Sequence, residues 1–510
     1  MPRGTVRLVG AGPGNPGLLT IRAKELLQRC RVLVFDSLVH PAVLAMVSPD
    51  CELIYVGKKS GGLAVHQDSI QKILVEKSKE GKEVVRLKGG DPYIFGRGGE
   101  EALFLKENGI AFEVVPGVTA ASGAAAYSGT PLTQRKSNST MVFVTGHEDP
   151  DKEASMVDWN QLPKENSVLC IYMGVGNLEP IVSKLIGAGF DPTTPVVCVE
   201  WATLGRQRVC RSRLNTVVED AEEFCLNSPA VIMVGENAKM GEEISWFEDK
   251  PLQGLRFVVT RSKGQASELS EMLEKRGAEV LGLPLISISK NVNEETMADV
   301  FAEIASYDWI VFSSPNGVRY FFEVFFETFD DIRSLGFLRI AAVGEATAKE
   351  VRKYFVTTDL MPKEANAESL AESLVETGSL DSSKVLLVTG NLGRDVLRSK
   401  LEEARAIVDR FEVYKTEPTD LSDDPAAKEF RSRGADAIIF TSSSGVKSFV
   451  DQAKDLVLES EANRPKTVSI GPITSSTMSK LGMPTDFQAE EASLDSLVNI
   501  VEQHFGKGSQ

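Results

Sequence analysis

The chain has 510 residues, of which 42% are hydrophobic, 25% charged and 7% aromatic, and its formal net charge at pH 7 is −16. These proportions exclude collagen-like, coiled-coil and wholly disordered chains. The acidic charge argues against nucleic acid or an anionic membrane as the main partner. At roughly one domain per 150 residues, the length predicts three or four domains.

Cysteine and histidine form no metal-binding pattern. None of the six cysteines occurs in a C-x-x-C pair and the four histidines lie far apart in the sequence, so we expect reduced core cysteines and no metal site. No apolar run approaches the roughly 18 residues of a membrane helix, and the first residues lack a signal-peptide pattern. We therefore expect a cytoplasmic protein.

Short β-branched runs alternate with amphipathic stretches along the whole chain, as in IRAKELLQR followed by RVLVFD. This alternation predicts α/β domains. The charged segment 236–254 lacks a strand pattern and is followed by a fresh strand, RFVVT. We place the main boundary there, with one domain over 1–245, a linker over 246–254 and a second domain over 255–510. No motif crosses the linker, so we expect each half to fold alone.

The second domain contains an internal repeat. RFVVTRSKG resembles KVLLVTGNLG, DWIVFSSPNGV resembles DAIIFTSSSGV, and IAAVGEAT resembles VSIGPITS. The pairs lie 129, 128 and 127 residues apart, counted from Thr260 to Thr389, Phe312 to Phe440 and Gly344 to Gly471. A solenoid needs at least three repeats, so the near-constant separation predicts two similar α/β lobes with a cleft between them.

Three glycine-rich turns in the first domain are candidates for ligand contact. VGAGPGNPG follows a strand, but Asn15 occupies the third glycine position of G-x-G-x-x-G and two prolines stiffen the turn, so it is not a dinucleotide fingerprint. LKGGDPYIFGRGGEE and VPGVTAASGAAAYSGTPLT share its design of small residues between a strand and a helix. Each turn either packs helix against strand tightly or lets backbone amides approach a ligand at the carboxyl end of a strand.

The combination of these motifs resembles a known family. GAGPGNPGLLT, FDSLV, VGKKSG, GGDPYIFGRGGEE, VPGVTAASGAAAYSGTPLTQR, VFVTGH, IYMG and SPAVIMVG follow the order and spacing of the tetrapyrrole (corrin/porphyrin) methylases, most closely uroporphyrinogen-III C-methyltransferase, over about residues 5–240. The resemblance implies a fold of two α/β lobes, S-adenosylmethionine bound between them, and a homodimer. It implies donor contacts from Pro13, Gly89, Gly90, Asp91, Ile94, Thr119, Ala120, Met173, Ala202 and Ala230.

The same resemblance assigns acid–base roles to two residues. Asp36 matches the family's proposed proton acceptor and Lys58 its proposed proton donor. A carboxylate near the macrocycle suits this chemistry because the methylated pyrrole carbon must lose a proton. Lys58 has the alternative role of pairing with a substrate carboxylate. Further candidates for the substrate carboxylates, each weighed against an ordinary surface role, are Arg97, Arg135, Arg206 and Arg208.

The second half resembles uroporphyrinogen-III synthase over about residues 254–505, through VVTR, VFSSPNGV, AVGEAT, VYKTEP, IIFTSSSGV and SIGPIT. The resemblance implies two flavodoxin-like lobes joined by a two-stranded linker. One lobe would comprise 255–286 and 417–506 and the other 287–416, so that the chain crosses near 284–289 and again near 414–418. It also implies that this half uses neither metal nor cofactor.

Hydroxyl-rich turns in this half suit the carboxylates of a linear tetrapyrrole. Candidate substrate-binding residues are Ser313, Ser314, Asn316, Thr441, Ser442, Ser443 and Thr474, and ordinary helix N-caps are the alternative for each. Tyr414 matches the family's tyrosine that helps to expel the hydroxyl leaving group, with a packed strand tyrosine as the alternative.

Together, the two resemblances predict a bifunctional enzyme. The second half would close hydroxymethylbilane to uroporphyrinogen III, and the first would methylate that product twice to precorrin-2, on the route to sirohaem or cobalamin. The alternative is a methylase of another corrinoid fused to a non-catalytic, ligand-binding pair of lobes.

Overall fold

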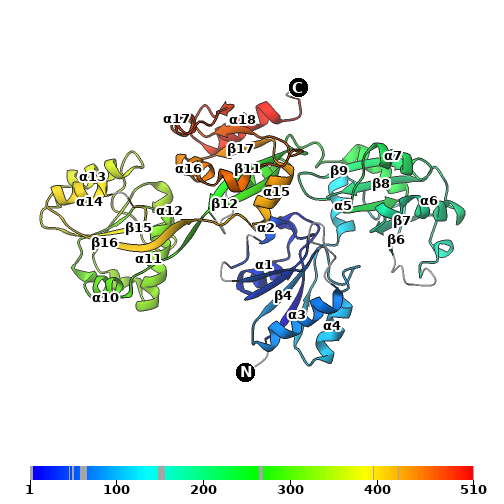
Figure 1. Cartoon of the computed structure of the whole chain (residues 1–510), viewed down its shortest axis with the longest axis horizontal. Helices are drawn as coiled ribbons and strands as arrows, with labels where there is room; N and C mark the ends of the chain where they lie inside the picture. Colours follow the sequence, from blue (N-terminus) through cyan, green and yellow to red (C-terminus); the bar gives the residue numbers. More distant parts are fainter. Residues whose placement is uncertain are drawn as a thin grey trace. The chain divides into compact units, whose positions relative to one another are not determined.

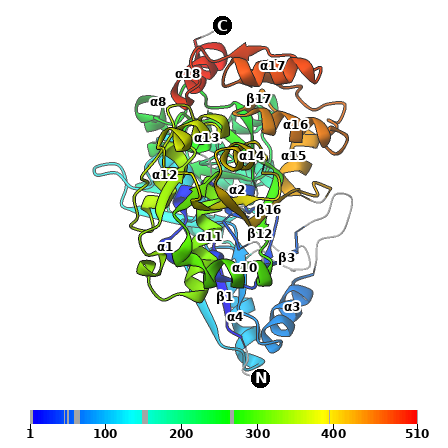
Figure 2. The ribbon, with the colours of Figure 1, turned by 90° about the vertical axis from the view of Figure 1, so that its left-hand side faces the viewer.

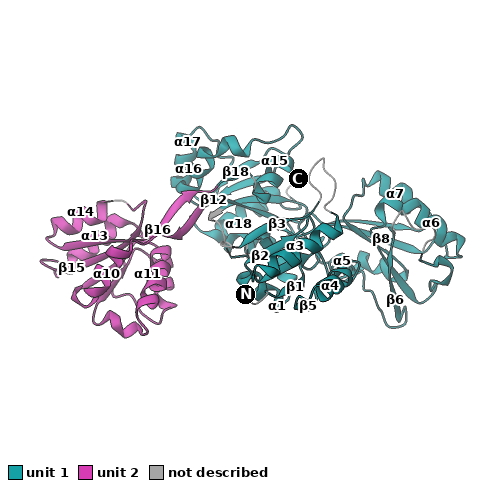
Figure 3. Ribbon diagram, turned by 60° about the horizontal axis from the view of Figure 1, so that its bottom comes forward, with its two compact units in different colours: residues 1–285, 420–510 teal, residues 286–419 magenta. Residues whose placement is uncertain are grey.

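The computed structural model describes residues 4–44, 46–48, 51–57, 66–147, 156–262, 268–393, 395–422 and 424–508. The chain divides into two compact units, with residues 1–285 and 420–510 in unit 1 and residues 286–419 in unit 2 (Figure 3). The chain leaves unit 1 within β12 (Glu279–Lys290) and returns just after β16 (Ile407–Pro418). This division does not fall at residue 250, so the boundary at 246–254 stays a prediction.

The first sheet of unit 1 is entirely parallel, in the order β3-β2-β4-β1-β5 (Figure 1, blue to cyan). Helices α1 and α2 cover one face and α3 and α4 the other, so the central strands are buried on both sides. The strands are β1 (Val6–Gly10), β2 (Val32–Phe35), β3 (Glu52–Tyr55), β4 (Val84–Lys88) and β5 (Phe112–Val115). The helices are α1 (Ile21–Arg29), α2 (Pro41–Leu44), α3 (Gln67–Lys79) and α4 (Gly98–Glu107).

The second sheet of unit 1 is mixed, in the order β6-β7-β10-β8-β9. Strands β6 and β7 are parallel, and the remaining neighbours are antiparallel. Helix α5 covers one face, and α6 and α7 cover the other. The strands are β6 (Thr140–Thr145), β7 (Ser167–Tyr172), β8 (Pro195–Glu200), β9 (Arg208–Arg213) and β10 (Ala230–Val234). The helices are α5 (Ala120–Ser128), α6 (Leu178–Gly187) and α7 (Val217–Glu223), and the short α8 (Gly241–Ile244) follows β10.

The third group of strands in unit 1 begins with the first part of β12 and continues through β11, β17, β18 and β19. Helices α9 and α18 pack on one face, and α15, α16 and α17 pack on the other, where α16 and α17 lie beside each other (Figure 2). The strands are β11 (Arg256–Ser262), β17 (Ala437–Phe440), β18 (Lys466–Ser469) and β19 (Phe487–Gln488). The helices are α9 (Glu268–Lys275), α15 (Pro425–Arg433), α16 (Ser443–Asp451), α17 (Pro472–Lys480) and α18 (Leu494–Phe505).

Unit 2 has the strand order β14-β13-β15-β16, with the end of β12 antiparallel to β16. Its phenylalanine-rich core lies between the sheet and helices α10, α11 and α12, and α13 and α14 cover the other face. The strands are β13 (Trp309–Phe312), β14 (Arg339–Ala342) and β15 (Lys384–Gly390), and the helices are α10 (Glu294–Ala302), α11 (Pro315–Thr328), α12 (Glu345–Arg352), α13 (Ala367–Glu376) and α14 (Val396–Glu403). The predicted repeat is visible, because β13 and β14 occupy in unit 2 the places of β17 and β18 in unit 1.

Five of the six cysteines are buried, as expected for core residues, but Cys225 is exposed. It follows α7 at the protein surface, where hydrophobic packing does not require it, so the expectation of a core position was wrong there. Within the described residues, none of the helices has the length and apolar character needed to span a membrane.

Candidate active sites

The three glycine-rich turns of the first domain meet at the carboxyl edge of the parallel sheet. The N–H of Gly90 donates to the carbonyl of Gly12 at 2.7 Å, and the N–H of Gly12 donates back at 3.2 Å. A Cβ on Gly10 would lie 2.6 Å from the nitrogen of Gly117, so the strand ends pack backbone against backbone. Gly90 has φ +66°, a conformation that favours glycine. The turns therefore form a cradle of bare backbone beside the start of α5.

Asp91 holds this cradle together. Its Oδ1 accepts the N–H of Tyr93 at 2.8 Å, and its Oδ2 accepts the N–H of Gly117 at 3.0 Å. The carboxylate thus ties the turn after β4 to the turn before α5. Its position in the sequence motif is explained by backbone hydrogen bonds even before any ligand is considered.

The second sheet brings its predicted donor contacts to the same place. The hydroxyl of Tyr172, at the end of β7, lies 2.7 Å from Oγ1 of Thr119 and accepts the N–H of Ala121 at 3.0 Å. Burial raises the pKa of Tyr172, which therefore stays protonated. Ile94, Ala120 and Ala202 pack in the apolar cluster that contains Tyr172.

The remaining donor candidates lie on the surrounding turns. Met173 follows Tyr172 with φ +55°, and Ala230 pairs in register with Glu200 at the same edge of the second sheet. Pro13 contacts α5, because a Cβ on Gly123 would lie 2.6 Å from its Cγ. The ten residues predicted from the family motifs thus lie at the edges where the two sheets face α5.

Asp36 lies directly after β2, next to this cradle. Its Oδ2 is 3.2 Å from Nη2 of Arg86, and its Oδ1 accepts the N–H of Leu38 at 3.1 Å. Leu38 in turn packs on the cradle, since a Cβ on Gly89 would lie 2.8 Å from the Cβ of Leu38. The side chain of Asp36 is 24% exposed, so its carboxylate remains open to a reactant. Lys58 lies outside the described residues.

Behind Asp36 lies a group of buried charges that the sequence motifs did not predict. Oε1 of Glu101 accepts Nζ of Lys88 at 2.9 Å and Nε2 of Gln67 at 3.0 Å, and lies 3.4 Å from Nε of Arg86. Burial and the neighbouring cation of Arg86 lower the pKa of Lys88, although Glu101 partly opposes this shift. The sequence nevertheless contains an indication of this group, because β4 reads VVRLK, with two basic residues on one face of a strand that is otherwise apolar.

The arginine candidates differ in their exposure and in the carboxylates with which they already form ion pairs. Arg97 is exposed and pairs with Glu100 at 2.7 Å, and Arg135 is exposed. Arg208 lies 3.2 Å from Glu200. Arg206 is largely but not fully buried, and its guanidinium forms ion pairs with two glutamates of the second half, which is a structural role that the sequence did not predict.

In unit 2, Tyr414 and Ser314 come together. Their hydroxyl oxygens are 3.0 Å apart, and Oγ of Ser314 also accepts the N–H of Gly317 as the N-cap of α11. The ring of Tyr414 is stacked near that of Tyr320, with 6.0 Å between centroids. Ser313 donates to the carbonyl of Val388 at 3.1 Å. Asn316 is half-buried in the first turn of α11.

The other hydroxyl candidates lie in unit 1, at the starts of α16 and α17. Ser442 is the N-cap of α16 and accepts the N–H of Gly445 at 3.1 Å. Ser443 accepts a hydrogen bond from Thr477 at 2.8 Å. Thr441 is half-buried at the end of β17, and Thr474 is buried in α17. The capping alternative therefore holds for Ser314 and Ser442, and a hydroxyl that caps a helix through a lone pair keeps its O–H for donation to a carboxylate.

Comparison with known proteins assigns each half. The family described as tetrapyrrole (corrin/porphyrin) methylases matches residues 5–218, and the family of uroporphyrinogen-III synthase HemD matches residues 267–499. Porphyrin biosynthesis protein HemD of Ruminiclostridium josui is 36% identical over 499 residues, which are 98% of each chain. Uroporphyrinogen-III C-methyltransferase of Bacillus subtilis (strain 168) is 37% identical, over 71% of this chain and 74% of the relative.

A solved structure of uroporphyrin-III C-methyl transferase from Thermus thermophilus, complexed with S-adenyl homocysteine, is 39% identical and has a TM-score of 0.41. It covers 46% of this chain and 99% of its own.

Two α/β halves, each with its own candidate site, define an enzyme of tetrapyrrole biosynthesis. The chain belongs to the family in which a tetrapyrrole methylase is fused to a uroporphyrinogen-III synthase. The family and fold predicted from the sequence motifs are thereby confirmed, whereas the roles of individual residues stay predictions.

Proposed function

We propose that the second half closes hydroxymethylbilane to uroporphyrinogen III and that the first half methylates this product twice to precorrin-2. The observation that carries the proposal is the order of the chemistry, because two families that catalyse consecutive steps match adjacent regions of one chain. The product of the second half is then the substrate of the first. Precorrin-2 would feed sirohaem or cobalamin synthesis.

The methyl donor we propose is S-adenosylmethionine, and the residues present fit it. The glycine turns offer backbone without side chains in front of it, and Thr119, Ala120 and Ala202 are small. When bound, this donor supplies an electrophilic methyl group on a positively charged sulfur. Bare backbone and small apolar side chains can bind the donor closely without a competing cation.

Asp36 would accept the proton that the methylated pyrrole carbon must lose. Its carboxylate is open to solvent on one side and paired with Arg86 on the other, and that pairing fixes its orientation. Such a group provides about 10²–10⁴-fold of rate when it acts as a general base. Lys58 would either donate a proton or pair with a substrate carboxylate. Arg97, which pairs with Glu100, and Arg135 are exposed cations that would contact other substrate carboxylates.

In the second half, Tyr414 would donate a hydrogen bond to the departing hydroxyl of hydroxymethylbilane. The hydroxyl of Ser314 at 3.0 Å holds the phenol in place. Serine and threonine hydroxyls at the starts of α11, α16 and α17 would bind substrate carboxylates, and helix N-termini favour anions. We propose that this half needs neither metal nor cofactor.

The family resemblance also supports a homodimer formed through the methylase half, a cytoplasmic location, and no nucleic-acid or membrane partner. Light scattering on the purified chain tests the first of these. A monomer at micromolar concentration would contradict it.

The decisive experiment uses the purified full chain with hydroxymethylbilane, with and without S-adenosylmethionine. We expect uroporphyrinogen III without the donor, in excess of the uninverted isomer that forms spontaneously, and a doubly methylated product with it. Supplying uroporphyrinogen III directly tests the methylase alone. Methylation of another corrinoid only, or a ratio of isomers equal to that of the spontaneous reaction without enzyme, would instead favour a methylase fused to a non-catalytic pair of lobes.

A further inference from the structure

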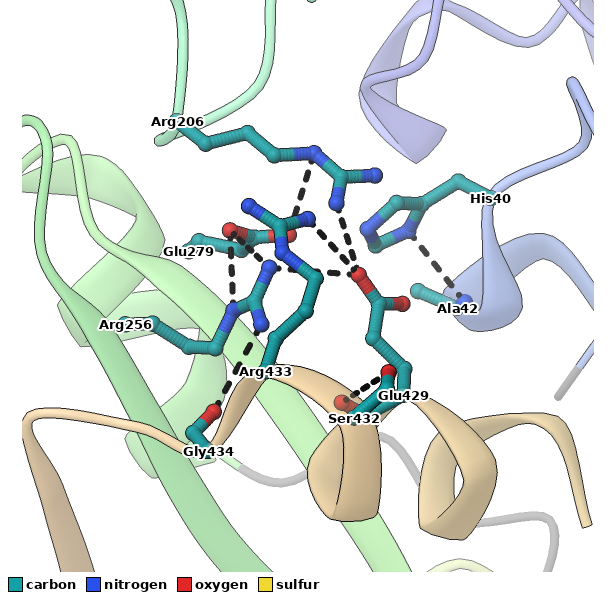
Figure 4. A network of polar contacts seen from close by, with 9 residues as sticks. All are labelled: His40, Ala42, Arg206, Arg256, Glu279, Glu429, Ser432, Arg433 and Gly434. Atoms are coloured by element: carbon teal, nitrogen blue, oxygen red, sulfur yellow. Dashed lines mark hydrogen bonds and ion pairs between the residues drawn. The ribbon is translucent and has the colours of Figure 1, made fainter. Parts of the chain in front are cut away.

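A cluster of largely buried charges inside unit 1, with the exposed Arg433 at its edge, joins the two family regions (Figure 4). Arg206 belongs to the region matched by the methylase family, whereas Glu279, Glu429 and Arg433 belong to the region matched by the synthase family. Arg256 lies between the two matched regions. The side chains of Arg206 and Glu279 are 12% and 5% exposed. Charges this deeply placed are found where specific partners compensate them.

The cluster is a closed arrangement of alternating charges. Nη1 of Arg206 lies 2.6 Å from Oε1 of Glu429, and its Nε lies 3.4 Å from Oε1 of Glu279. Nη2 of Arg256 lies 3.0 Å from Glu279 and 3.2 Å from Glu429, and Arg433 reaches Glu429 at 3.2 Å. Burial alone would raise the pKa of Glu429, but Arg206 and Arg256 outweigh burial and hold its pKa below the ordinary value.

Backbone contacts accompany the ion pairs. The N–H of Gly254 donates to the carbonyl of Gly205 at 2.7 Å, and Nε2 of Gln253 donates to the carbonyl of Gln207 at 2.6 Å. A Cβ on Gly205 would overlap the backbone nitrogen of Glu279. This approach is possible only for glycine, so shape as well as charge matches the turn 201–207 to the synthase region.

The turn 201–207 also belongs to the methyl-donor side of the structure. It contains Ala202, a proposed donor contact, and the N–H of Thr203 donates to Oε1 of Gln207 at 2.8 Å. Oγ1 of Thr203 then accepts the N–H of Asn15 in the first glycine turn at 3.0 Å. A continuous path of hydrogen bonds therefore runs from Gln253 to the donor cradle.

The segment that carries Asp36 reaches the same cluster. His40, four residues later, is turned toward Glu429 (Figure 4), and its Nδ1 accepts the N–H of Ala42 in the first turn of α2. Both loops that border the proposed methylation site thus lie beside charges of the synthase region.

We propose that the turn 201–207 is a docking surface for the synthase region of the same chain, and that this contact holds the donor-side loops in their binding conformation. Affinity for the methyl donor then depends on residues far from the donor, such as Glu429. The identity of the donor rests on the proposed function, but the docking contact does not.

The test measures binding of S-adenosylhomocysteine to the full chain by titration calorimetry. Glu429→Gln removes a charge from the synthase side, and Gly205→Ala disturbs the contact without changing charge. We expect each to weaken binding about tenfold or more, as for a typical coupling between sites. The control is Glu402→Gln, which removes an exposed carboxylate paired with Arg398 on α14 and should leave affinity unchanged.

Hydrogen exchange of segment 201–207 provides a readout that does not depend on the donor. The backbone amides of this segment should exchange faster in Glu429→Gln and in Gly205→Ala than in the wild type and in Glu402→Gln. Wild-type affinity in both variants would overturn the coupling, and unchanged exchange would overturn the docking contact. If the wild type binds no S-adenosylhomocysteine, the proposed function fails, and the exchange data alone decide whether the docking contact exists.

Discussion

The fully buried carboxylate of Glu101 is the most sensitive point of the first sheet. It compensates Lys88 and Arg86, whose side chains are 6% and 4% exposed. Glu101→Gln keeps the shape of the side chain but leaves Asp36 paired with Arg86 and removes the carboxylate that pairs with Lys88 among the described contacts. Removing one partner of a buried ion pair costs about 3–5 kcal/mol. Since a whole domain is stable by about 5–15 kcal/mol, we expect a large fraction of its stability to be lost.

The loss should become smaller as the pH rises. Burial already holds the pKa of Lys88 below its ordinary value of 10.5, and removing Glu101 lowers that pKa further. Between the folded-state pKa and 10.5 the unfolded chain binds more protons than the folded chain, so stability increases with pH in this window. The variant should therefore recover part of its stability between pH 7 and pH 9.5, because Lys88 can lose its proton whereas Arg86 cannot.

Differential scanning calorimetry of the full chain at both pH values measures this effect. At about 2–4 °C per kcal/mol, the transition of the affected domain should fall by roughly 6–20 °C at pH 7. The matched control is Glu100→Gln on the same helix turn, where an exposed pair with Arg97 contributes less than about 1 kcal/mol. If the transition temperature of Glu101→Gln equalled that of this control, or if its difference from the wild type were independent of pH, Glu101 would not compensate the buried charges of Lys88 and Arg86.

Substitutions at three further positions test the proposed sites. Asp36→Asn should lower methylation about 10²–10⁴-fold while S-adenosylhomocysteine binds normally in a calorimetric titration, and normal turnover would remove Asp36 from the mechanism. Gly90→Leu should abolish that binding, because its side chain would point toward the start of α5. Gly90→Ala should reduce the free energy of unfolding by only about 1–2 kcal/mol through its positive φ, because its Cβ would lie 3.6 Å from the nitrogen of Ala120. Tyr414→Phe removes the proposed donor to the leaving hydroxyl together with its contact to Ser314, so uroporphyrinogen III should form more slowly. Methylation of supplied uroporphyrinogen III and the melting temperature should stay nearly unchanged. An unaltered cyclisation rate would make Tyr414 a packing residue.

Local patterns in the sequence predicted the features that local physics determines. The glycine turns ending β1 and β4 were visible because only glycine tolerates the observed backbone approach and the positive φ of Gly90. The capping serines Ser314 and Ser442 were also predictable from local sequence, since a hydroxyl before a helix accepts a hydrogen bond from a backbone N–H of the first turn. Both features need only a few consecutive residues.

Contacts between distant residues were not predictable in this way. Arg206 and Glu429 are 223 residues apart, and nothing near either one indicates its partner. The sequence therefore suggested two halves separated by a linker, whereas Gly254 and Gln253 of that linker are hydrogen-bonded to Gly205 and Gln207. Separating the two halves near residue 250 would break these contacts, which the linker composition did not indicate.

The two copies of the repeat in the second half share their helix-capping serines but not Tyr414. Ser314 and Ser442 are 128 residues apart and cap equivalent helices, so duplication alone explains their presence in both units. Tyr414 is different, because the residue 128 positions earlier is Ile286. The serine that meets the tyrosine lies in unit 2, whereas Ser442 lies 3.0 Å from the hydroxyl of Ser444 in unit 1. The repeat thus supplies the serine-capped helix starts twice, and the proposed hydrogen-bond donor to the leaving group belongs to one lobe, as a reaction at one end of an asymmetric linear substrate requires.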